Sequence, residues 1–302
     1  MKPWEAEVQL TTDQAAALIA GQFPELTPVD AVYFGRGWDN TAYLVNGVYV
    51  FRFPRRAFAL PFFETELRVL GAIAPKLPLP IPDPILIGRP AGDYLWPFAG
   101  YRLIEGQTVC SANLTDAQRA DNASILATFL RILHSIPIDE AGRAGAGPDP
   151  IRRMDVGHRT NQLREDIGKI LGTGMKPPSN WEAIVDAVLP PSDIKTLVHG
   201  DLYARHLLVD AKAKISGVID WGDCHIGHPA IDLAIVHSFL PPEAHAAFLT
   251  AYGPVDESTW TLARWRALQH TSMLALFAHD TVDANLMRDC DTTFRYLERS
   301  SA

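Results

Sequence analysis

The sequence predicts an α+β fold in two lobes, a small antiparallel-sheet lobe over residues 1–105 and a larger, mainly helical lobe over residues 106–302. Three observations predict it. The length of 302 residues is enough for two ordinary domains. Residues 29–53 contain three runs rich in β-branched and aromatic residues, which is typical of strands. Beyond Gly106 the pattern changes to long amphipathic helices.

The first lobe begins with a helix signal. Thr11 and Gln14 have the spacing of a capping box, the apolar run AAALIA follows, and Gly21 is expected to close the helix. The strand-like runs are VYFGRG, TAYLV and VYVFRF, and the last two are joined by Asn46-Gly47. Asn-Gly between such runs indicates a hairpin with a type I′ turn, because both residues tolerate a positive φ. These runs therefore predict a three-stranded antiparallel meander.

The remainder of this lobe is expected to hold one helix and two more strands. Residues 62–74 have a helical pattern, and the proline-dense connector PKLPLPIPDP follows them. The runs ILIG and YLWPFAGYRLI are further strand candidates. The change of pattern places the lobe boundary near Glu105-Gly106.

The second lobe is predicted to be helical, with short strands in its middle. Thr115 and Gln118 form a second capping-box pair ahead of ILATFLRILHSI. Helices are also expected over residues 151–171, from Ser179 with Glu182, and over residues 229–302. The short apolar runs TLVHG, HLLVD and ISGVID interrupt the helices between residues 196 and 220.

The composition excludes several classes of function. Lys and Arg number 27 against 35 Asp and Glu, a net charge of −8, so the chain offers no basic stripe for nucleic acid. The first ten residues lack the apolar core of a signal peptide, and no apolar run is long enough to span a bilayer. Three widely spaced cysteines favour a reducing compartment. We therefore expect a cytoplasmic protein whose acidic charge suits a cationic or neutral ligand.

The densest group of chemistry-bearing residues lies in LVHGDLYARHLLVD and ISGVIDWGD. Asp201 and His206 are separated by one predicted loop, while Asp220 and Asp223 follow the next strand. Carboxylates and an imidazole can therefore converge on one point. Convergent acids outside surface ion pairs usually hold a divalent cation or a proton to be moved.

This order of parts resembles the protein-kinase arrangement, and most closely its small-molecule branch, the aminoglycoside and macrolide phosphotransferases. The matching segments are His199-Gly200-Asp201, His206, Ile219-Asp220 and the run GHPAIDLA at residues 227–234. The resemblance implies a bilobal kinase-like fold over nearly the whole chain. It also implies that Asp201 orients the acceptor hydroxyl, and that His206 and Asp220 hold Mg²⁺.

The resemblance also assigns nucleotide-binding residues to the first lobe. FGRGWDNTAYLV is similar to the strand pair over the nucleotide phosphates, with backbone access at Gly35 and Gly37. Arg52 stands where the family usually has Lys, and a guanidinium can also bind phosphate. Its partner on the following helix would be Glu66, with Glu64 as the rival in another alignment register. The RLIEG segment resembles the hinge, and the residues whose backbone would bond the purine are Leu103, Ile104 and Glu105.

His206 is the more informative departure from the usual pattern. Most such loops end in Asn, whose amide oxygen is a hard ligand for Mg²⁺, whereas imidazole is softer. The form H-G-D-L-x-x-x-H-L-L resembles that of macrolide 2′-phosphotransferases, which shifts the expectation from aminoglycosides towards macrolides. His199 is expected to orient the loop. Asp232 is interpreted either as an anchor for the loop or as an ordinary charge at a helix N-terminus.

The acceptor is expected to lie against residues 151–189 and the C-terminal helices. Residues 241–302 contain eight acids and five arginines, a small surplus for a polycationic aminoglycoside. The candidate acceptor-binding residues are Trp260, Trp265, Met273 and Phe277, although ordinary helix packing explains such residues equally well.

Together these features predict an antibiotic-resistance enzyme, a macrolide 2′-phosphotransferase that uses GTP or ATP with Mg²⁺. The resemblance favours GTP, but a hinge backbone can bind either purine. One alternative is another small-molecule kinase on this fold, acting on an aminoglycoside, a choline-like amine or a sugar. A second is a catalytically silent nucleotide-binding pseudokinase, because Arg52 and His206 replace the usual Lys and Asn.

Overall fold

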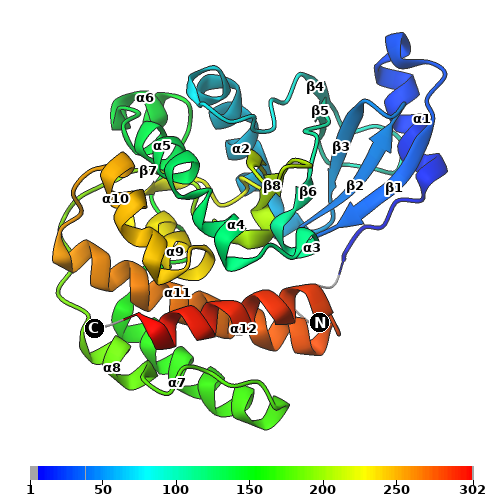
Figure 1. Cartoon of the computed structure of the whole chain (residues 1–302). Coiled ribbons are helices and arrows are strands. Elements are labelled where there is room, and N and C mark those ends of the chain that lie inside the picture. Colours follow the sequence, from blue (N-terminus) through cyan, green and yellow to red (C-terminus); the bar gives the residue numbers. More distant parts are fainter. Residues whose placement is uncertain (1–5, 38, 301–302) are drawn as a thin grey trace. The chain divides into compact units, whose positions relative to one another are not determined.

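The computed structural model describes residues 6–37 and 39–300, and the chain divides into two compact units. The first unit comprises residues 1–75 and 80–104, and the second comprises residues 76–79 and 105–302 (Figure 1). The second unit therefore takes up Glu105 and part of the proline-dense connector, both of which the sequence placed in the first lobe. Strand β6 (Gln107–Thr108) explains the division, because it pairs with β8 (Leu207–Val209) of the second unit.

The first unit is built on a five-stranded antiparallel sheet of order β1-β2-β3-β5-β4. Its strands are β1 (Ala31–Arg36), β2 (Asn40–Val45), β3 (Tyr49–Pro54), β4 (Leu86–Gly88) and β5 (Phe98–Arg102). The turn between β2 and β3 has positive φ at Asn46 (52°) and Gly47 (66°), as the Asn-Gly signal predicts. The three-stranded meander and both further strands are confirmed.

Two helices accompany this sheet, α1 (Thr12–Gln22) and α2 (Leu60–Ile73). The capping box of Thr11 and Gln14 is present, but Gly21 lies inside α1 and does not end it. Side chains alternate across β3, so Phe51 and Phe53 belong to the aromatic core that α1 covers, while Arg52 points to the opposite face. On that face Arg52 meets α2.

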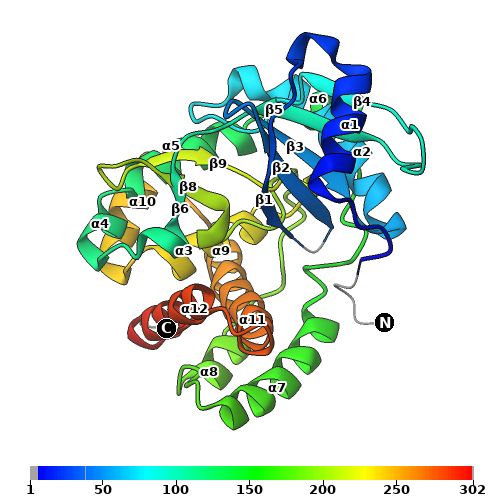
Figure 2. The same cartoon turned by 90° about the vertical axis from the view of Figure 1, so that its right-hand side faces the viewer.

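The second unit is mainly helical (Figure 2). Its helices are α3 (Val109–Ala112), α4 (Asp116–Ala120), α5 (Ala123–His134), α6 (Ile138–Arg143), α7 (Val156–Thr173), α8 (Trp181–Asp186), α9 (Ala230–Phe239), α10 (His245–Tyr252), α11 (Glu257–Asp280) and α12 (Ala284–Arg299). Helix α11 packs against α7, α9 and α12, and Figures 1 and 2 both show α11 beside α12. The centre of α11 is therefore buried among other helices.

Five short strands of the second unit hold its chemistry-bearing loops. Strand β7 (Thr196–Val198) pairs with β10 (His225–Gly227), and β8 pairs with β9 (Ile215–Val218) as well as with β6. The predicted strands in the middle of this unit are thus present. A two-stranded and a three-stranded sheet frame the loops that follow β7 and β9.

The predicted helix starts in this unit have mixed outcomes. Thr115 and Gln118 form the expected capping box, but it opens the short helix α4, and α5 begins separately at Ala123. The expected cap at Ser179 is wrong, because α8 begins at Trp181 and Ser179 instead bonds Glu298 of α12. Ser179 therefore links the segment before α8 to α12 and does not cap α8.

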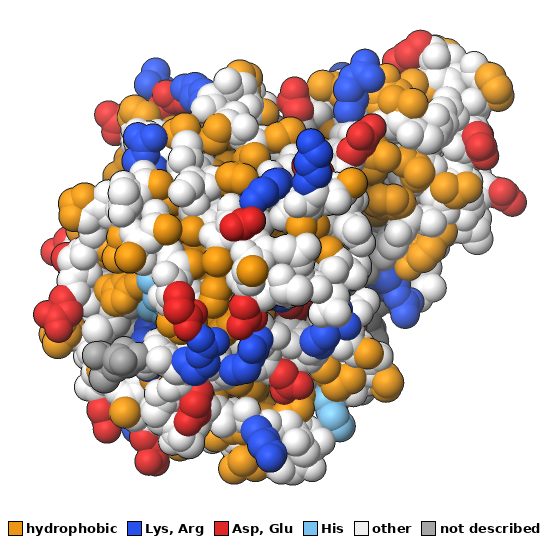
Figure 3. Space-filling view, in the orientation of Figure 1, with side chains coloured by type: hydrophobic (Ala, Val, Ile, Leu, Met, Phe, Trp, Pro, Cys, Tyr) orange, Lys and Arg blue, Asp and Glu red, His pale blue; other side chains and the backbone are white. Residues whose placement is uncertain are grey.

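Charged side chains of both signs are interspersed on the face seen in Figure 3. The second unit contains ion pairs between such charges, for example Arg295 with Asp116 and Arg299 with Glu243. The acidic surplus of the chain does not collect into one patch on this face. Among the described helices, none combines the length and the apolar character needed to cross a membrane.

Candidate active site

The loop between β7 and β8 carries the HGD motif and requires a glycine at its centre. Gly200 has a φ of +87°, in the left-handed region. A Cβ placed on it would lie 2.2 Å from the Asp223 carbonyl oxygen. Residue 200 therefore lets the loop pass directly over the chain that follows Asp220.

Asp232, near the start of α9, anchors this loop. Its two carboxylate oxygens accept hydrogen bonds from the backbone N–H groups of His199 (2.7 Å) and Gly200 (2.9 Å). His134 of α5 contacts the same carboxylate at 3.2 Å. Burial raises the pKa of Asp232, but these donors outweigh burial and lower it overall. Of the two interpretations of Asp232, the contacts support the anchor.

His199 ties the loop to the segment that holds Asp220. Its Nε2 donates to the carbonyl of Ile219 at 3.0 Å, and its Nδ1 accepts from the Asp201 backbone N–H at 3.3 Å. A ring that donates at one nitrogen and accepts at the other is neutral. Burial, the largest cause, lowers the pKa of His199 and favours that form. His199 is fully buried, and its two contacts join the loop to the segment that ends at Asp220.

His206 and Asp220 face each other. His206 ends the short helical turn Ala204–His206, and its Nδ1 lies 2.7 Å from the Asp201 carbonyl, which can only accept. Nδ1 is therefore the donor, and Nε2 points at Asp220 Oδ2, 3.2 Å away. Burial lowers the pKa of His206, but the charges of Asp220 and Asp201 outweigh it and raise the pKa overall. Asp220 itself has a φ of 64°, a strained backbone that often marks a functional position.

These two side chains offer one imidazole nitrogen and one carboxylate oxygen to a cation. Within residues 6–37 and 39–300, no group of three or more His, Cys, Asp or Glu side chains is arranged to hold a metal. Mg²⁺ commonly takes one or two carboxylates and completes its shell with substrate phosphates and water. The Asp220 side chain, about half exposed, fits that partial role. The pair therefore suits a cation that arrives with a phosphorylated ligand.

Asp201 projects from the same loop and has a partner that the sequence did not reveal. Its side chain is 26% exposed, and its Oδ1 lies 3.1 Å from Nε2 of His270 on α11. Burial raises the pKa of Asp201, but the hydrogen bond from His270 and the charges of His206 and Arg266 hold it well below its usual range. Asp201 is therefore an ionised carboxylate that accepts hydrogen bonds.

Asp223 belongs to a neighbouring network. Arg153, a buried residue before α7, forms ion pairs with both Asp149 and Asp223. The Arg153–Asp149 contact measures 2.5 Å. This arginine joins the segment after β9 to the segment before α7, a role that nothing in the sequence pattern indicated.

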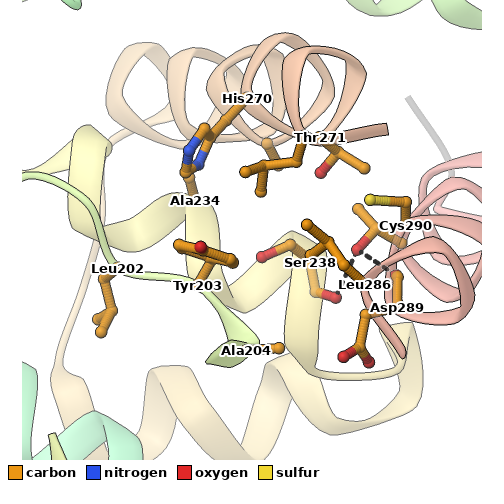
Figure 4. A pocket seen from close by; sticks show the side chains of 13 residues that line it. Leu202, Tyr203, Ala204, Ala234, Ser238, His270, Thr271, Leu286, Asp289 and Cys290 are labelled. Carbon is orange, nitrogen blue, oxygen red and sulfur yellow. Dashed lines mark hydrogen bonds between the residues drawn. The ribbon is translucent and has the colours of Figure 1, made fainter. Parts of the chain in front are cut away.

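A small cavity lies behind the loop, between Tyr203 and the helices α9, α11 and α12 (Figure 4). Its walls include His270, Thr271, Ser238 and Asp289. The volume of about 20 Å³ has room for a water molecule but not for an antibiotic. The cavity is therefore a packing feature beside the site, and it is no acceptor pocket.

In the first unit, Arg52 of β3 and Glu66 of α2 form a buried ion pair. Glu64, the rival partner, is exposed. The two candidates differ because Glu66 shares a face of α2 with the buried residues Phe63, Val69 and Ile73. The spacing of three or four residues between the apolar positions of α2 is visible in the sequence. It places Glu66, and not Glu64, on the buried face.

The two glycines of the β1–β2 segment are in open surroundings. A Cβ at Gly35 or Gly37 would meet no atom within 4 Å. The packing of the described residues therefore does not require glycine at either position. Trp38, which lies inside the same motif, is outside the described residues.

The hinge residues are partly engaged already. The Leu103 N–H donates to the Val48 carbonyl at 2.8 Å, so it is not available to a purine, which corrects the expectation for that group. The carbonyl of Glu105 accepts from Ser216 Oγ at 3.1 Å. The peptide groups of Ile104 make no hydrogen bond with the described residues.

The four candidate acceptor-binding residues separate into two pairs. Trp265 is fully buried and donates its Nε1–H to Thr160 of α7, so its assignment to the acceptor site is wrong and it is a packing residue. Trp260 packs against the buried ring of His237 and the partly buried ring of His245, which ties it to the packing of these helices.

Met273 and Phe277 differ from the two tryptophans. Met273 is 37% exposed and Phe277 is partly buried. At spacings of three and seven residues from His270, both lie on the face of α11 that reaches Asp201.

Comparison with known proteins assigns the chain to a family. The model of the phosphotransferase enzyme family matches residues 30–268. The chain belongs to this family. A viomycin phosphotransferase of Streptomyces vinaceus is 28% identical over 237 residues, covering 76% of this chain and 80% of that protein. The uncharacterized protein YcbJ of Bacillus subtilis strain 168 is 26% identical over 224 residues, 70% of each chain.

Solved structures of antibiotic phosphotransferases share the fold of this family member. The GDP complex of an aminoglycoside 2′-phosphotransferase superimposes with a TM-score of 0.70 at 21% identity, covering 96% of this chain and 99% of that one. A macrolide 2′-phosphotransferase of type I gives 0.64 at 24% identity, covering 96% and 98%. The predicted α+β, kinase-like fold and the predicted family are confirmed.

Proposed function

We propose that this phosphotransferase moves the γ-phosphoryl group of GTP or ATP to a hydroxyl of a macrolide, the 2′-hydroxyl of its amino sugar, and so confers resistance. The observation that carries the transfer chemistry is the loop of residues 199–206. It fixes an ionised Asp201 on one side and aligns His206 with Asp220 on the other. These are the two parts that phosphoryl transfer needs, a group that orients the nucleophile and a cation site.

Asp201 would act mainly by orientation. A carboxylate with a strongly lowered pKa is a weak base, so its main contribution is to accept a hydrogen bond from the acceptor hydroxyl and direct that oxygen. Phosphoryl transfer passes through a loose transition state in which positioning and electrostatics provide most of the catalysis. His206 and Asp220 would hold Mg²⁺, which offsets charge on the transferring group when it is bound.

The first unit would bind the nucleotide. Arg52, held by Glu66, supplies a cation for the phosphates, and the open surroundings of Gly35 and Gly37 leave the backbone accessible. Ile104, whose peptide groups are unbonded among the described residues, and Glu105 would meet the purine edge. GDP is the nucleotide in one structural relative and ATP in another, which supports a nucleotide donor without selecting the base.

The charges near the C-terminus support a weakly cationic acceptor such as a macrolide. Five of the eight acids in residues 241–302 are already engaged: Asp256 caps α11, Asp283 pairs with Arg205, Asp289 pairs with Arg119, Glu298 bonds Ser179, and Glu243 pairs with Arg299. A polycationic aminoglycoside needs several uncommitted carboxylates. A lactone ring with one amino sugar needs apolar contact, which Met273 and Phe277 could provide.

The viomycin phosphotransferase relative, at 28% identity, supports viomycin as a second candidate acceptor. A single panel separates the candidates. Purified protein is incubated with Mg²⁺ and GTP or ATP, together with erythromycin, kanamycin, viomycin or choline. Mass spectrometry then detects the gain of one phosphoryl group. We expect phosphorylation of erythromycin and little or none of the others.

Asp201→Ala is the control for the chemistry. General-base and orienting groups contribute about 10²- to 10⁴-fold, so we expect the variant to lose at least about 100-fold in kcat at unchanged thermal stability. Asp193→Ala, at an exposed aspartate of the same unit, should retain full activity. Phosphorylation of viomycin or kanamycin alone would replace the macrolide proposal. Absence of turnover with every acceptor would contradict the enzyme assignment and favour a pseudokinase.

A further inference from the structure

Helix α11 presents a stripe of side chains to the catalytic loop. Arg266, His270, Met273 and Phe277 follow one another at spacings of four, three and four residues, so they lie on one face of the helix. His270 is the member of this stripe that touches Asp201, at 3.1 Å. His270 therefore joins this face of α11 to the carboxylate of Asp201.

The loop backbone is fixed by other contacts, but the Asp201 side chain is not. Asp232 and His199 hold the peptide groups of residues 199–201, and His206 binds the Asp201 carbonyl. None of these bonds sets the rotation of the carboxylate. His270 contacts Oδ1, while the nearest His206 nitrogen is 3.8 Å from Oδ2. The direction of the carboxylate thus depends on His270.

His270 is well placed for this task because it is itself immobilised. The residue is buried, and its ring packs edge-on against Tyr203 at 5.4 Å between centroids. Tyr203 packs in turn on His206 at 4.3 Å. The rings of His270, Tyr203 and His206 thus pack in sequence, from α11 to the imidazole that faces Asp220.

The protonation of His270 follows from its partner. An ionised carboxylate has no proton to donate, so Nε2 must carry the proton in the contact with Oδ1. Burial and the nearby Arg266 charge lower the pKa of His270, which keeps the ring neutral. A neutral donor holds the carboxylate without neutralising it.

We propose that His270 is a positioning residue, which donates Nε2–H to Oδ1 of Asp201 and so leaves Oδ2 directed at the acceptor hydroxyl. The role of the hydroxyl rests on the proposed function, whereas the contact itself does not. No proton is transferred to or from His270 in this role. Its loss would therefore reduce the rate of the chemical step and leave nucleotide binding intact.

Kinetics of two substitutions test the role, with the acceptor that the panel identifies. Gln offers an amide donor near the position of Nε2, and Leu offers none. Because misplacement of a reacting group by about 1 Å can cost about 100-fold, we expect His270→Leu to lose about that factor in kcat with an unchanged KM for the nucleotide. His270→Gln should recover most of the loss. Ser272→Ala, which removes a buried hydroxyl bonded within α11 itself, should match wild type.

Three kinetic results would overturn the proposal. They are a wild-type kcat in His270→Leu, a His270→Gln variant no better than His270→Leu, and a change confined to the KM of the acceptor, which would make His270 an acceptor-binding residue. Thermal melting of each variant confirms that the fold is retained. If His270→Leu fails to fold, His270→Gln and the spectroscopic test below decide.

A measurement without any acceptor separates failure of this proposal from failure of the proposed function. In protein labelled with ¹⁵N-histidine, the Nε2–H of His270 should give a downfield proton signal that is absent from His270→Gln. We expect Asp201→Ala to remove or shift that signal and to leave the other histidine signals in place. A signal that persists unchanged in Asp201→Ala would show that Asp201 is not its partner and would refute the proposal, whatever the panel finds.

Discussion

The HGD loop of the second unit and the β1–β2 segment of the first unit are held in opposite ways. The loop of residues 199–206 is bonded to Asp232, Ile219 and His270, and a Cβ at Gly200 would collide with backbone. In the β1–β2 segment, a Cβ at Gly35 or Gly37 would meet no atom of the described residues within 4 Å. Glycine is thus required by the protein's own packing in one region and not in the other.

Glycine therefore has two different roles within one chain. Around Asp201, which we propose orients the acceptor hydroxyl, several buried polar contacts fix the backbone. Where the phosphates of a nucleotide are expected, the backbone is left accessible and a cation, Arg52, is supplied from a buried ion pair. The more firmly held of the two regions is thus the one to which we assign the transfer chemistry.

Substitution of alanine for Gly200 and for Gly35 tests whether the two regions differ in packing. Gly200→Ala should have the largest effect. The positive φ costs about 1–2 kcal/mol for a residue with a Cβ, and overpacking costs about 1–3 kcal/mol more. We expect a loss of about 3–4 kcal/mol in the free energy of unfolding, measured by urea titration, together with a strong fall in kcat.

Gly35→Ala is the matched variant. Its stability should stay within about 1 kcal/mol of wild type, because the added methyl group has open space. Its KM for the nucleotide should rise if the phosphates approach this backbone. Equal stability losses in the two variants would show that the two regions are not packed differently. An unchanged KM in Gly35→Ala would remove Gly35 from the nucleotide site.

The Arg52–Glu66 ion pair is the buried polar contact of the first unit whose removal we test next. Breaking a buried ion pair costs about 3–5 kcal/mol because an uncompensated charge remains, and Gln keeps one hydrogen bond, so we expect Glu66→Gln to lose about 3 kcal/mol. The KM for the nucleotide should rise as Arg52 loses its orientation. Glu64→Gln, at the exposed rival position, should change neither quantity. Urea and nucleotide titrations measure the two quantities. If Glu64→Gln lowers stability and raises the KM while Glu66→Gln changes neither, Glu66 is not the partner of Arg52.

Much of the fold could be predicted because local signals and global structure agree. Asn46-Gly47 fixes its hairpin through φ alone, and the capping boxes at Thr11 and Thr115 act within one turn of helix. The predictions that Gly21 ends a helix and that Ser179 caps one are wrong, because the surrounding structure decides the role of each residue. A helix tolerates Gly21, and a contact with Glu298 takes up Ser179.

The site was predictable in part for the same reason. Asp201, His206 and Asp220 lie within twenty residues of one another, so a motif can describe them. His270 and His134 reach the loop from helices far away in the sequence, and no spacing rule connects them to Asp201 or Asp232. The burial of Trp265 could not be predicted, because the sequence does not show whether an apolar residue on a helix packs against another helix or faces a ligand.

The smallest predicted effect concerns a third region, where the buried His237 packs with the partly buried His245 and Trp260. The two imidazoles lie 5.2 Å apart between ring centroids, and both pack on Trp260. Burial is the largest cause that lowers the pKa of each, and the Arg264 charge adds to it. The folded state therefore resists protonation at positions where the unfolded chain titrates near about pH 6.5.

The sign follows from proton binding. Below about pH 6.5 the unfolded state binds more protons than the folded state, so stability is complete above that pH and falls as the pH drops, by at most about 1.4 kcal/mol per histidine and pH unit. We expect urea titrations between about pH 7.5 and 5.5 to show a decline that is about 1 kcal/mol smaller in His237→Leu than in wild type. The slope is the informative quantity, because loss of the ring lowers stability at every pH. Parallel declines in the two proteins would mean that His237 titrates alike in the folded and unfolded states, and that its burial in this core carries no electrostatic cost.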